Sequence, residues 1–171
     1  MSEPAEDSGG GDGRGWSEVI LPIERILAPT DFSSISERTL GAAAELAEHF
    51  RAHLFLLHVV PPVPLLPGDP QNGMALEIPS YQQALQESAD GRLRELARKI
   101  VPKGVGYTVS VCQGDPAREI VDSAERERIQ LIVIATHGLT GWQHLVFGSV
   151  AEKVVRTSRC PVLTVRAGRE E

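Results

Sequence analysis

Two segments of the sequence carry residue types that could bind a phosphate-bearing ligand. Residues 28–33 (Ala-Pro-Thr-Asp-Phe-Ser) place the Asp31 carboxylate close to hydroxyl side chains, directly after an apolar run. Residues 135–149 contain Gly138 near their start and Gly148-Ser149 at their end, where a helix is expected to begin. Glycine allows the backbone to approach a ligand closely, and the unpaired N–H groups at a helix start attract phosphate oxygens. This spacing alone fits either an anion-binding loop or glycines that serve only as turns.

The better-known nucleotide-binding and catalytic signatures do not occur in the sequence. There is no GxxxxGK[ST] motif, and no GxGxxG motif follows a predicted strand. Ser149 lacks the G-x-S-x-G elbow of a hydrolase nucleophile. His137 and His144 have no Cys, Asp or Glu nearby at metal-ligand spacing. We therefore exclude P-loop and dinucleotide-binding proteins, and we assign no catalytic residue and no metal ligand.

The pattern of the chain predicts repeated β-α units around a parallel sheet, because short apolar runs alternate with segments of helical period. The predicted strands are residues 26–28, 54–60, 105–111, 131–135 and 162–165. Residues 131–134 are apolar on both faces, which is typical of a central strand. Four helices are predicted: one from a capping box at 34–37, one whose buried stripe runs from Tyr81 to Ile100, one opened by Asp115-Pro116, and one opened by a capping box at 149–152.

Composition and charge narrow the class of protein further. The chain has 171 residues, of which 42% are hydrophobic and 23% charged, so we expect one globular domain. A net charge of −6 argues against nucleic acid or an anionic membrane surface as a partner. No apolar run approaches the roughly 20 residues of a membrane helix. Cys112 and Cys160 form no CxxC pattern, which excludes a disulfide framework and favours a cytoplasmic protein.

The ends of the chain and one internal segment differ from the rest in composition. Residues 1–18 are acidic and glycine-rich, and we expect a disordered tail that is not a signal peptide, followed by a domain over 19–168 and a short tail at 169–171. Residues 61–79 are rich in proline and exceed the roughly 12–15 residues usual for a loop. Such an insertion is either a mobile flap or a lid over a ligand, and the lack of a catalytic grouping in it favours the flap.

Several ordered motifs resemble the universal stress protein family, in its single-domain nucleotide-binding form, from about Glu24 to Arg166. They are Pro29-Thr30-Asp31-Phe32-Ser33, Leu57-His58-Val59, Gly114-Asp115-Pro116, Thr136-His137-Gly138, and residues 148–154 and 160–165. The resemblance implies a three-layer open α/β sandwich of the adenine nucleotide alpha hydrolase-like type, with four helices and five parallel strands in the order 3-2-1-4-5. That order reverses between the first and fourth strands, and both candidate segments follow those strands.

The resemblance also implies an ATP site, with magnesium carried by the phosphates. Nucleotide-binding members of the family carry G-x2-G-x9-G-[ST], which aligns with residues 135–149. By that alignment the phosphates are held by Gly138, Gly148, Ser149 and Val150, and His137 lies in the same loop. Asp31 meets the ribose. The adenine is faced by the backbone around Pro29, Thr30 and Val59, and Ile134 packs beside the base or sugar.

Ala135 departs from the family pattern, because the first glycine of the motif is usual at this position, and its methyl group could crowd the ribose or the phosphate chain or resist a positive φ. If the ligand requires a positive φ there, the cost is roughly 1–2 kcal/mol, or about a tenfold loss of affinity. We therefore expect weakened ATP binding, with an absence of binding as the alternative.

Some of these residues also have ordinary structural roles. Asp31 could cap the first helix, in competition with Ser33 or Ser34, and Ser149 is expected to cap the fourth. His58 lies in a predicted strand and fits a packed, hydrogen-bonded residue better than a titrating one. Cys160 is expected to be a small buried hydrophobic residue.

The last predicted strand, at the edge of the sheet, favours a homodimer. Its residues Val162, Leu163, Thr164 and Val165 offer an apolar edge that can pair with a second copy. The expected function is a stress-response regulator that binds ATP at the ends of strands one and four and acts on an unidentified protein partner. The alternatives are a nucleotide-independent interaction module with an empty cleft and a slow ATPase or autophosphorylating protein. Efficient hydrolysis is not expected, because no lysine lies in the phosphate loop and no general base is evident.

Overall fold

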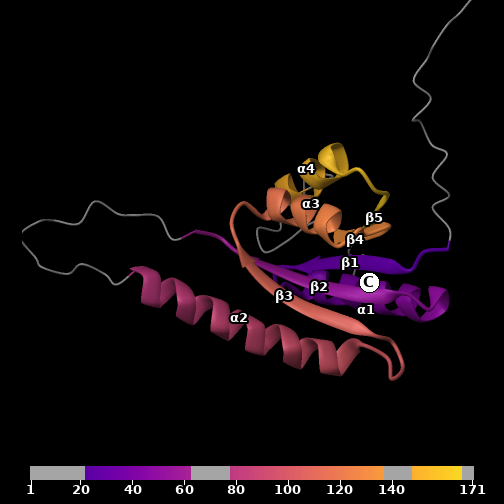
Figure 1. Cartoon of the computed structure of the whole chain (residues 1–171), viewed down its shortest axis with the longest axis horizontal. Helices are drawn as coiled ribbons and strands as arrows, with labels where there is room; N and C mark the ends of the chain where they lie inside the picture. Colours follow the sequence, from indigo (N-terminus) through magenta and orange to yellow (C-terminus); the bar gives the residue numbers. More distant parts are fainter. Residues whose placement is uncertain (1–21, 63–77, 137–147, 167–171) are drawn as a thin grey trace, which may run out of the picture.

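Five parallel strands form one sheet in the computed structural model, which describes residues 22–62, 78–136 and 148–166. The strands are β1 (Arg25–Thr30), β2 (His53–Val60), β3 (Tyr107–Gln113), β4 (Leu131–Ala135) and β5 (Val162–Val165). Their order is β3-β2-β1-β4-β5, so the predicted strand order is confirmed (Figure 1). The order reverses between β1 and β4, which places a switch point there.

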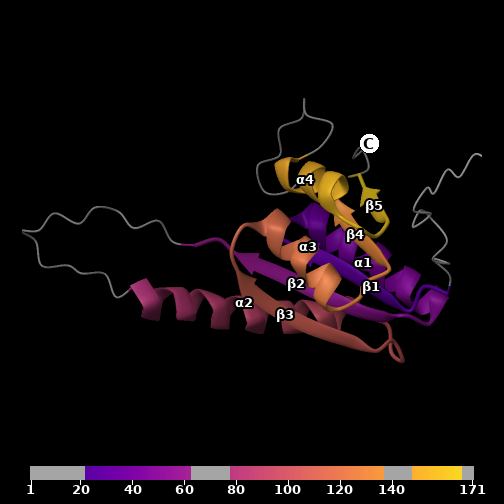
Figure 2. The same cartoon turned by 45° about the horizontal axis from the view of Figure 1, so that its top comes forward.

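Helices cover both faces of the sheet and complete the three predicted layers. They are α1 (Ser34–Phe50), α2 (Ile78–Ile100), α3 (Pro116–Arg126) and α4 (Ser149–Thr157). Helices α1 and α2 lie on one face, and α3 and α4 lie on the other (Figures 1 and 2). Parallel strands require such crossover connections, and helices on both faces explain why the strands carry so many apolar residues.

The core consists of two layers that share the central strands. One cluster packs α1 and α2 against the sheet and includes Leu40, Leu93 and Val133. The other packs α3 and α4 against the opposite face and includes Ile132 and Ile134. Successive residues of β4 therefore enter different layers, which confirms the interpretation of 131–134 as a central strand buried on both sides.

Several element boundaries differ from the sequence-based prediction, beginning with β1, which spans Arg25–Thr30 rather than residues 26–28. Strand β3 begins at Tyr107 rather than at residue 105 and extends to Gln113, because its ladder with β2 runs from Leu54–Tyr107 to Val60–Gln113. Helix α2 begins at Ile78, inside the segment expected as an insertion. The rest of that insertion from residue 63, and the predicted tails at 1–18 and 169–171, lie outside the described residues.

Two helix starts and one side chain of α2 test the sequence-based predictions. Ser33, one of the three candidate caps, caps α1, and its Oγ accepts from the Ser36 amide, so the capping box predicted to start at Ser34 was wrong. Gly148 is the N-cap of α4 and Ser149 is its first residue, so the prediction that Ser149 caps this helix was wrong. Tyr81 is 57% exposed, while its neighbour Gln82 is buried. The backbone at each helix start decides which hydroxyl can reach an amide, and residue type alone does not determine this.

The two halves of the sheet are joined by a short seam between β1 and β4. Within the described residues, these strands pair at only two positions, Ile26 with Leu131 and Leu27 with Ile132. Below this seam the Gln130 amide oxygen accepts from the Glu24 and Arg25 backbone amides at 2.8 and 3.2 Å. The strands are thus held together at their amino ends and left unpaired at their carboxyl ends, where a space opens between them.

Among the described residues, no helix has the length and apolar character needed to cross a membrane.

Candidate functional site

A cavity of about 350 Å³ lies where β1 and β4 separate, at the carboxyl ends of the strands. This is within the usual range for small-molecule sites, which is about 300–1,000 Å³. Every predicted site residue that the structure describes lines it: Pro29, Thr30, Asp31, Val59, Ile134, Ala135, Gly148, Ser149 and Val150. His137 and Gly138 lie outside the described residues. The switch point therefore brings together side chains and backbone from the two candidate segments.

The Asp31 loop is held by a short chain of hydrogen bonds. The Asp31 Oδ1 atom accepts from the Ser33 amide at 3.0 Å and from the Ser33 hydroxyl at 2.6 Å. The Thr30 hydroxyl oxygen accepts from the Phe32 amide at 3.0 Å and lies 2.9 Å from the Ser36 hydroxyl. These bonds fix the carboxylate at the cavity wall, so Asp31 supports the turn into α1 without capping the helix.

The opposite wall of the cavity is the start of α4. The Gly148 amide donates to the Thr136 carbonyl at 2.6 Å, which connects the end of β4 to this helix. Ser149 is exposed, and the N-cap residue Gly148 has no side chain with which to cap the first amides. A helix start of this kind presents N–H groups and partial positive charge to an anion.

Ala135 does not require the backbone conformation for which glycine would be needed. The described non-glycine residues with positive φ are Phe32, Arg51 and Arg128, and Ala135 is not among them. Ala135 is the last residue of β4, in an extended strand that any residue can adopt. Ala135 is therefore unstrained in this structure, and the weaker ATP binding expected from it stays a prediction, because it depends on the conformation that a bound ligand requires.

His58 also lines the cavity, and the sequence analysis did not include it in the site. Its Nδ1 atom lies 2.8 Å from the Thr30 carbonyl oxygen, which can only accept, so Nδ1 carries the proton and donates. The expectation of a packed, hydrogen-bonded strand residue is confirmed. The signal that could have placed it is the register, because His58 pairs with Thr30 across the β1–β2 ladder. Ser36, Leu57, Pro61, Pro116, Ile120, Thr136 and Ala151 complete the lining and were also missed.

Burial lowers the pKa of His58, and the nearby Arg92 adds to this, while the Thr30 carbonyl and Asp31 act in the opposite direction. Burial and Arg25 likewise lower the pKa of His53 from its ordinary value of 6.5. The folded protein therefore binds fewer protons than the unfolded chain just below pH 6.5, and we expect the free energy of unfolding to fall as the pH falls through this range. Urea unfolding between about pH 7.5 and about pH 5.5 measures this change.

The variant His58→Asn should reduce this pH dependence, because it keeps a donor near Thr30 and removes the titrating ring. The same change at exposed His49 is the matched control, since it removes a histidine from the surface. An undiminished pH dependence in His58→Asn would contradict the assignment to this ring.

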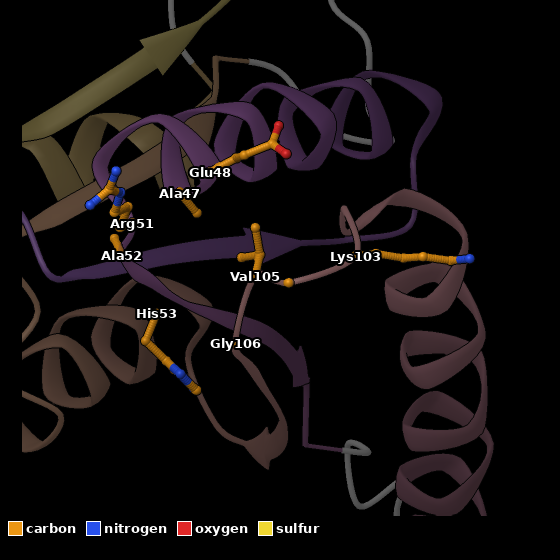
Figure 3. A pocket seen from close by; sticks show the side chains of 9 residues that line it. Ala47, Glu48, Arg51, Ala52, His53, Lys103, Val105 and Gly106 are labelled. Carbon is orange, nitrogen blue, oxygen red and sulfur yellow. The ribbon is translucent and has the colours of Figure 1, made fainter.

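A second hollow, of about 400 Å³, lies at the amino end of β2 and contrasts with the first. Figure 3 shows that the charged ends of Glu48, Arg51 and Lys103 do not converge, because Arg51 extends to one side while Glu48 and Lys103 extend to the other. The His53 ring is engaged elsewhere, with Nε2 2.9 Å from the Thr108 hydroxyl. Because its polar groups do not converge, this hollow lacks the arrangement expected of a ligand site.

The thiols and acidic groups do not point to covalent or metal chemistry. Burial is the main cause that raises the pKa of Cys112 to about 11, with Glu119 adding to it, and burial also raises the pKa of Cys160. Both are therefore weak nucleophiles at neutral pH, and Cys160 is half-buried and in contact with the Ser158 hydroxyl. In the described parts of the chain, no three His, Cys, Asp or Glu side chains gather as a metal site would require.

The sheet order, the helical layers and the cavity at the switch point together define an open α/β protein with a ligand-sized crevice at the carboxyl ends of its strands. The chain belongs to the universal stress protein family, whose model matches residues 22–166. It is 34% identical over 148 residues to universal stress protein MJ0531 of Methanocaldococcus jannaschii, covering 86% of this chain and 85% of that protein.

Solved structures share the predicted adenine nucleotide alpha hydrolase-like fold. The universal stress protein UspA from Lactobacillus plantarum superimposes with a TM-score of 0.73 at 22% identity, covering 84% of this chain and 98% of that one. A universal stress protein in complex with cAMP gives a TM-score of 0.61 at 20% identity, covering 85% and 98%. A universal stress protein from Archaeoglobus fulgidus in complex with dAMP gives 0.51 at 22% identity, covering 83% and 96%.

Proposed function

We propose that this protein is a cytoplasmic stress-response regulator that binds ATP, with magnesium carried by the phosphates, in the cavity between β1 and β4. The observation that carries the proposal is that the described residues assigned to nucleotide binding from the sequence all line this one cavity. Two proteins with the same fold bind adenine nucleotides in their crystal structures, namely cAMP and dAMP. An adenine nucleotide is therefore the first ligand to test.

The chemistry of the lining fits the parts of such a ligand. Asp31 supplies a carboxylate that can accept hydrogen bonds from ribose hydroxyls. Val59 and Ile134 supply apolar surface for a base. Gly148 and Ser149 supply the amides of a helix start for phosphate oxygens. Magnesium would be held mainly by the phosphates, because it retains much of its hydration shell and needs few protein ligands.

A regulatory role is a better fit than efficient catalysis. Among the described lining residues there is no Lys or Arg to stabilise a transferring phosphoryl group. The His58 Nδ1 atom donates to the Thr30 carbonyl, which leaves Nε2 as the only nitrogen of this ring that can accept a proton, and no described cation of the lining would stabilise the phosphoryl group that a water attacks. Any hydrolysis by this cavity is therefore expected to be slow, and the signal would be the bound state itself.

Two measurements test the proposal. Mass spectrometry of the small molecules released from freshly purified protein should detect an adenine nucleotide, and titration calorimetry with ATP and magnesium should give one site per chain. GTP is the matched control for the base. If purified protein releases no nucleotide and calorimetry detects no ATP binding, the cavity is empty and the protein is a nucleotide-independent interaction module.

We further propose that the protein forms a homodimer through β5. This strand lies at the edge of the sheet and pairs with β4 on its other side, and Leu163 is 42% exposed there. An apolar edge strand is a template for pairing with a second copy. Leu163→Lys should raise the dimer dissociation constant about tenfold or more, because it places like charges across a two-fold axis.

Sedimentation velocity measures this change as a shift toward the monomer. The matched control is Tyr107→Lys, which adds the same charge at an exposed position on the opposite edge strand, β3. An unchanged sedimentation coefficient for Leu163→Lys, or an equal shift for Tyr107→Lys, would rule out β5 as the interface.

A further inference from the structure

Phe32 adopts a backbone conformation that side-chain-bearing residues rarely occupy. Its φ is 62°, in the left-handed region, and it lies between Asp31 and the α1 cap residue Ser33. A bulky residue keeps this conformation only when its surroundings hold it there. The structure around Phe32 therefore controls the path of the backbone on which the Asp31 carboxylate is carried.

Two side chains from different elements contact the Phe32 ring. The His58 ring of β2 lies with its centroid 4.3 Å away at an angle of 33°. The Arg92 guanidinium carbon of α2 lies 4.3 Å from the ring centroid, which is cation–π distance. The sequence does not reveal this contact, because Arg92 lies 60 positions from Phe32 and belongs to a different element.

Arg92 also holds the backbone of the same loop. Its Nη2 atom donates to the Phe32 carbonyl at 3.3 Å, and it lies 3.8 Å from the Glu37 carboxylate in α1. One guanidinium thus contacts the ring, the carbonyl and the first turn of the following helix. The planar, multiply donating group of arginine suits such a combination better than a lysine ammonium does.

We propose that Arg92 is a positioning residue for the nucleotide site, which holds Phe32 in its left-handed conformation and thereby fixes Asp31 for the ligand. The coupling passes along the chain. Thr30 accepts from the Phe32 amide, and Asp31 accepts from both donors of Ser33, so a rotation at Phe32 disturbs the bonds on each side of Asp31. This inference rests on the proposed function, since it deepens the account of the same cavity.

The coupling has a consequence for α2. Arg92 belongs to a helix that lies along β3 (Figure 2), and no described residue of this helix is among those that line the cavity. If this helix helps to hold Asp31, then by linkage a nucleotide on Asp31 restrains Arg92 and the helix that carries it. The position of α2 then depends on whether the site is occupied, which would let a regulatory protein display its ligand state on an outer helix.

The test compares Arg92→Met with Arg94→Met. Both remove a charged group from α2 and keep a flexible apolar stem, but the ion pair of Arg94 is with Asp90 in its own helix. Arg92→Met should weaken ATP binding about fivefold and speed amide hydrogen exchange in the peptide spanning 30–37. Arg94→Met should change neither the ATP affinity nor the exchange rate. Arg92→Lys keeps the cation, so its ATP affinity and exchange rate should lie between those of the wild type and Arg92→Met.

A double-mutant cycle separates positioning from simple charge attraction between Arg92 and the phosphates. Asn tolerates the left-handed region, so Phe32→Asn keeps the backbone path and removes the ring. In the Phe32→Asn background, Arg92→Met should have a clearly smaller effect on ATP binding. An equal effect in both backgrounds would overturn the proposal, as would unchanged hydrogen exchange at residues 30–37 in Arg92→Met.

The exchange measurement is made on the protein without added nucleotide, so the two proposals can fail separately. If ATP binds and Arg92→Met changes neither affinity nor exchange, the positioning role is wrong and the proposed function stands. If exchange accelerates in Arg92→Met but no nucleotide binds to the wild-type protein, the proposed function is wrong. Arg92 then holds the loop for another purpose, and the inference that it positions a nucleotide site is overturned.

Discussion

Asp31→Asn should weaken ATP binding by about 10- to 100-fold. Hydrogen bonds to a charged group contribute about 1.5–3 kcal/mol, and the substitution removes the charge from the acceptor that faces the cavity. An asparagine keeps a carbonyl oxygen that can still accept from the Ser33 amide and hydroxyl. The loop should therefore remain in place, so that the change in affinity reports the lost charge.

Titration calorimetry measures the affinity, and urea unfolding measures whether the fold is intact. The matched control is Asp115→Asn, which removes an exposed carboxylate from the N-cap of α3 and keeps a capping oxygen. Asp115→Asn should bind ATP as the wild type does. Wild-type affinity in Asp31→Asn would mean that the ribose does not meet this carboxylate and that the nucleotide lies elsewhere.

Ser149→Glu should weaken ATP binding by about 100-fold or more, the largest effect we expect from a single substitution. It places a carboxylate at the first residue of α4, where the phosphates are proposed to lie, and like charges brought together in an interface cost several kcal/mol. The same carboxylate stabilises the helix itself, because it meets the positive end of the dipole, by about 0.3–1 kcal/mol. Binding and stability should thus change in opposite directions.

This opposition makes the outcome easy to interpret. If Ser149→Glu damages the fold, both the ATP affinity and the free energy of unfolding should fall, whereas repulsion of the phosphates lowers only the affinity. Ser149→Gln, which adds similar bulk without charge, is the control and should retain most of the affinity. If Ser149→Glu binds ATP normally, the phosphates do not approach the start of α4, and the orientation proposed for the ligand is wrong.

The sequence was sufficient for the architecture, since apolar runs and capping signals follow local rules that the tertiary structure respects. Residues 131–134 show this well, because a strand apolar on both faces must be covered on both, as β4 is. The strand order came from the family resemblance, because periodicity does not say which strands pair. Boundaries were less accurate, as at β3, where pairing with β2 extends the strand to Gln113.

The site was predictable where a residue directly follows a strand, as Asp31 does, or begins a helix, as Ser149 does. His58 was missed as a lining residue because its role depends on the register that sets it opposite Thr30. Arg92 was missed because its contact with Phe32 spans two elements that no local pattern connects. The backbone conformation of Ala135 without a ligand follows from its place at the end of β4, and a motif comparison does not contain that information.

The short seam between β1 and β4 gives the ligand a mechanical role. Each half of the sheet is continuous, since β1 pairs with β2 over six residues and β4 pairs with β5 over four, but the halves share only two ladder pairs in the described residues. Beyond these two pairs, the carboxyl ends of the two central strands line the cavity. A ligand that binds Asp31 on one side and the start of α4 on the other would connect the two halves of the sheet, so that an occupied site restrains their motion relative to each other.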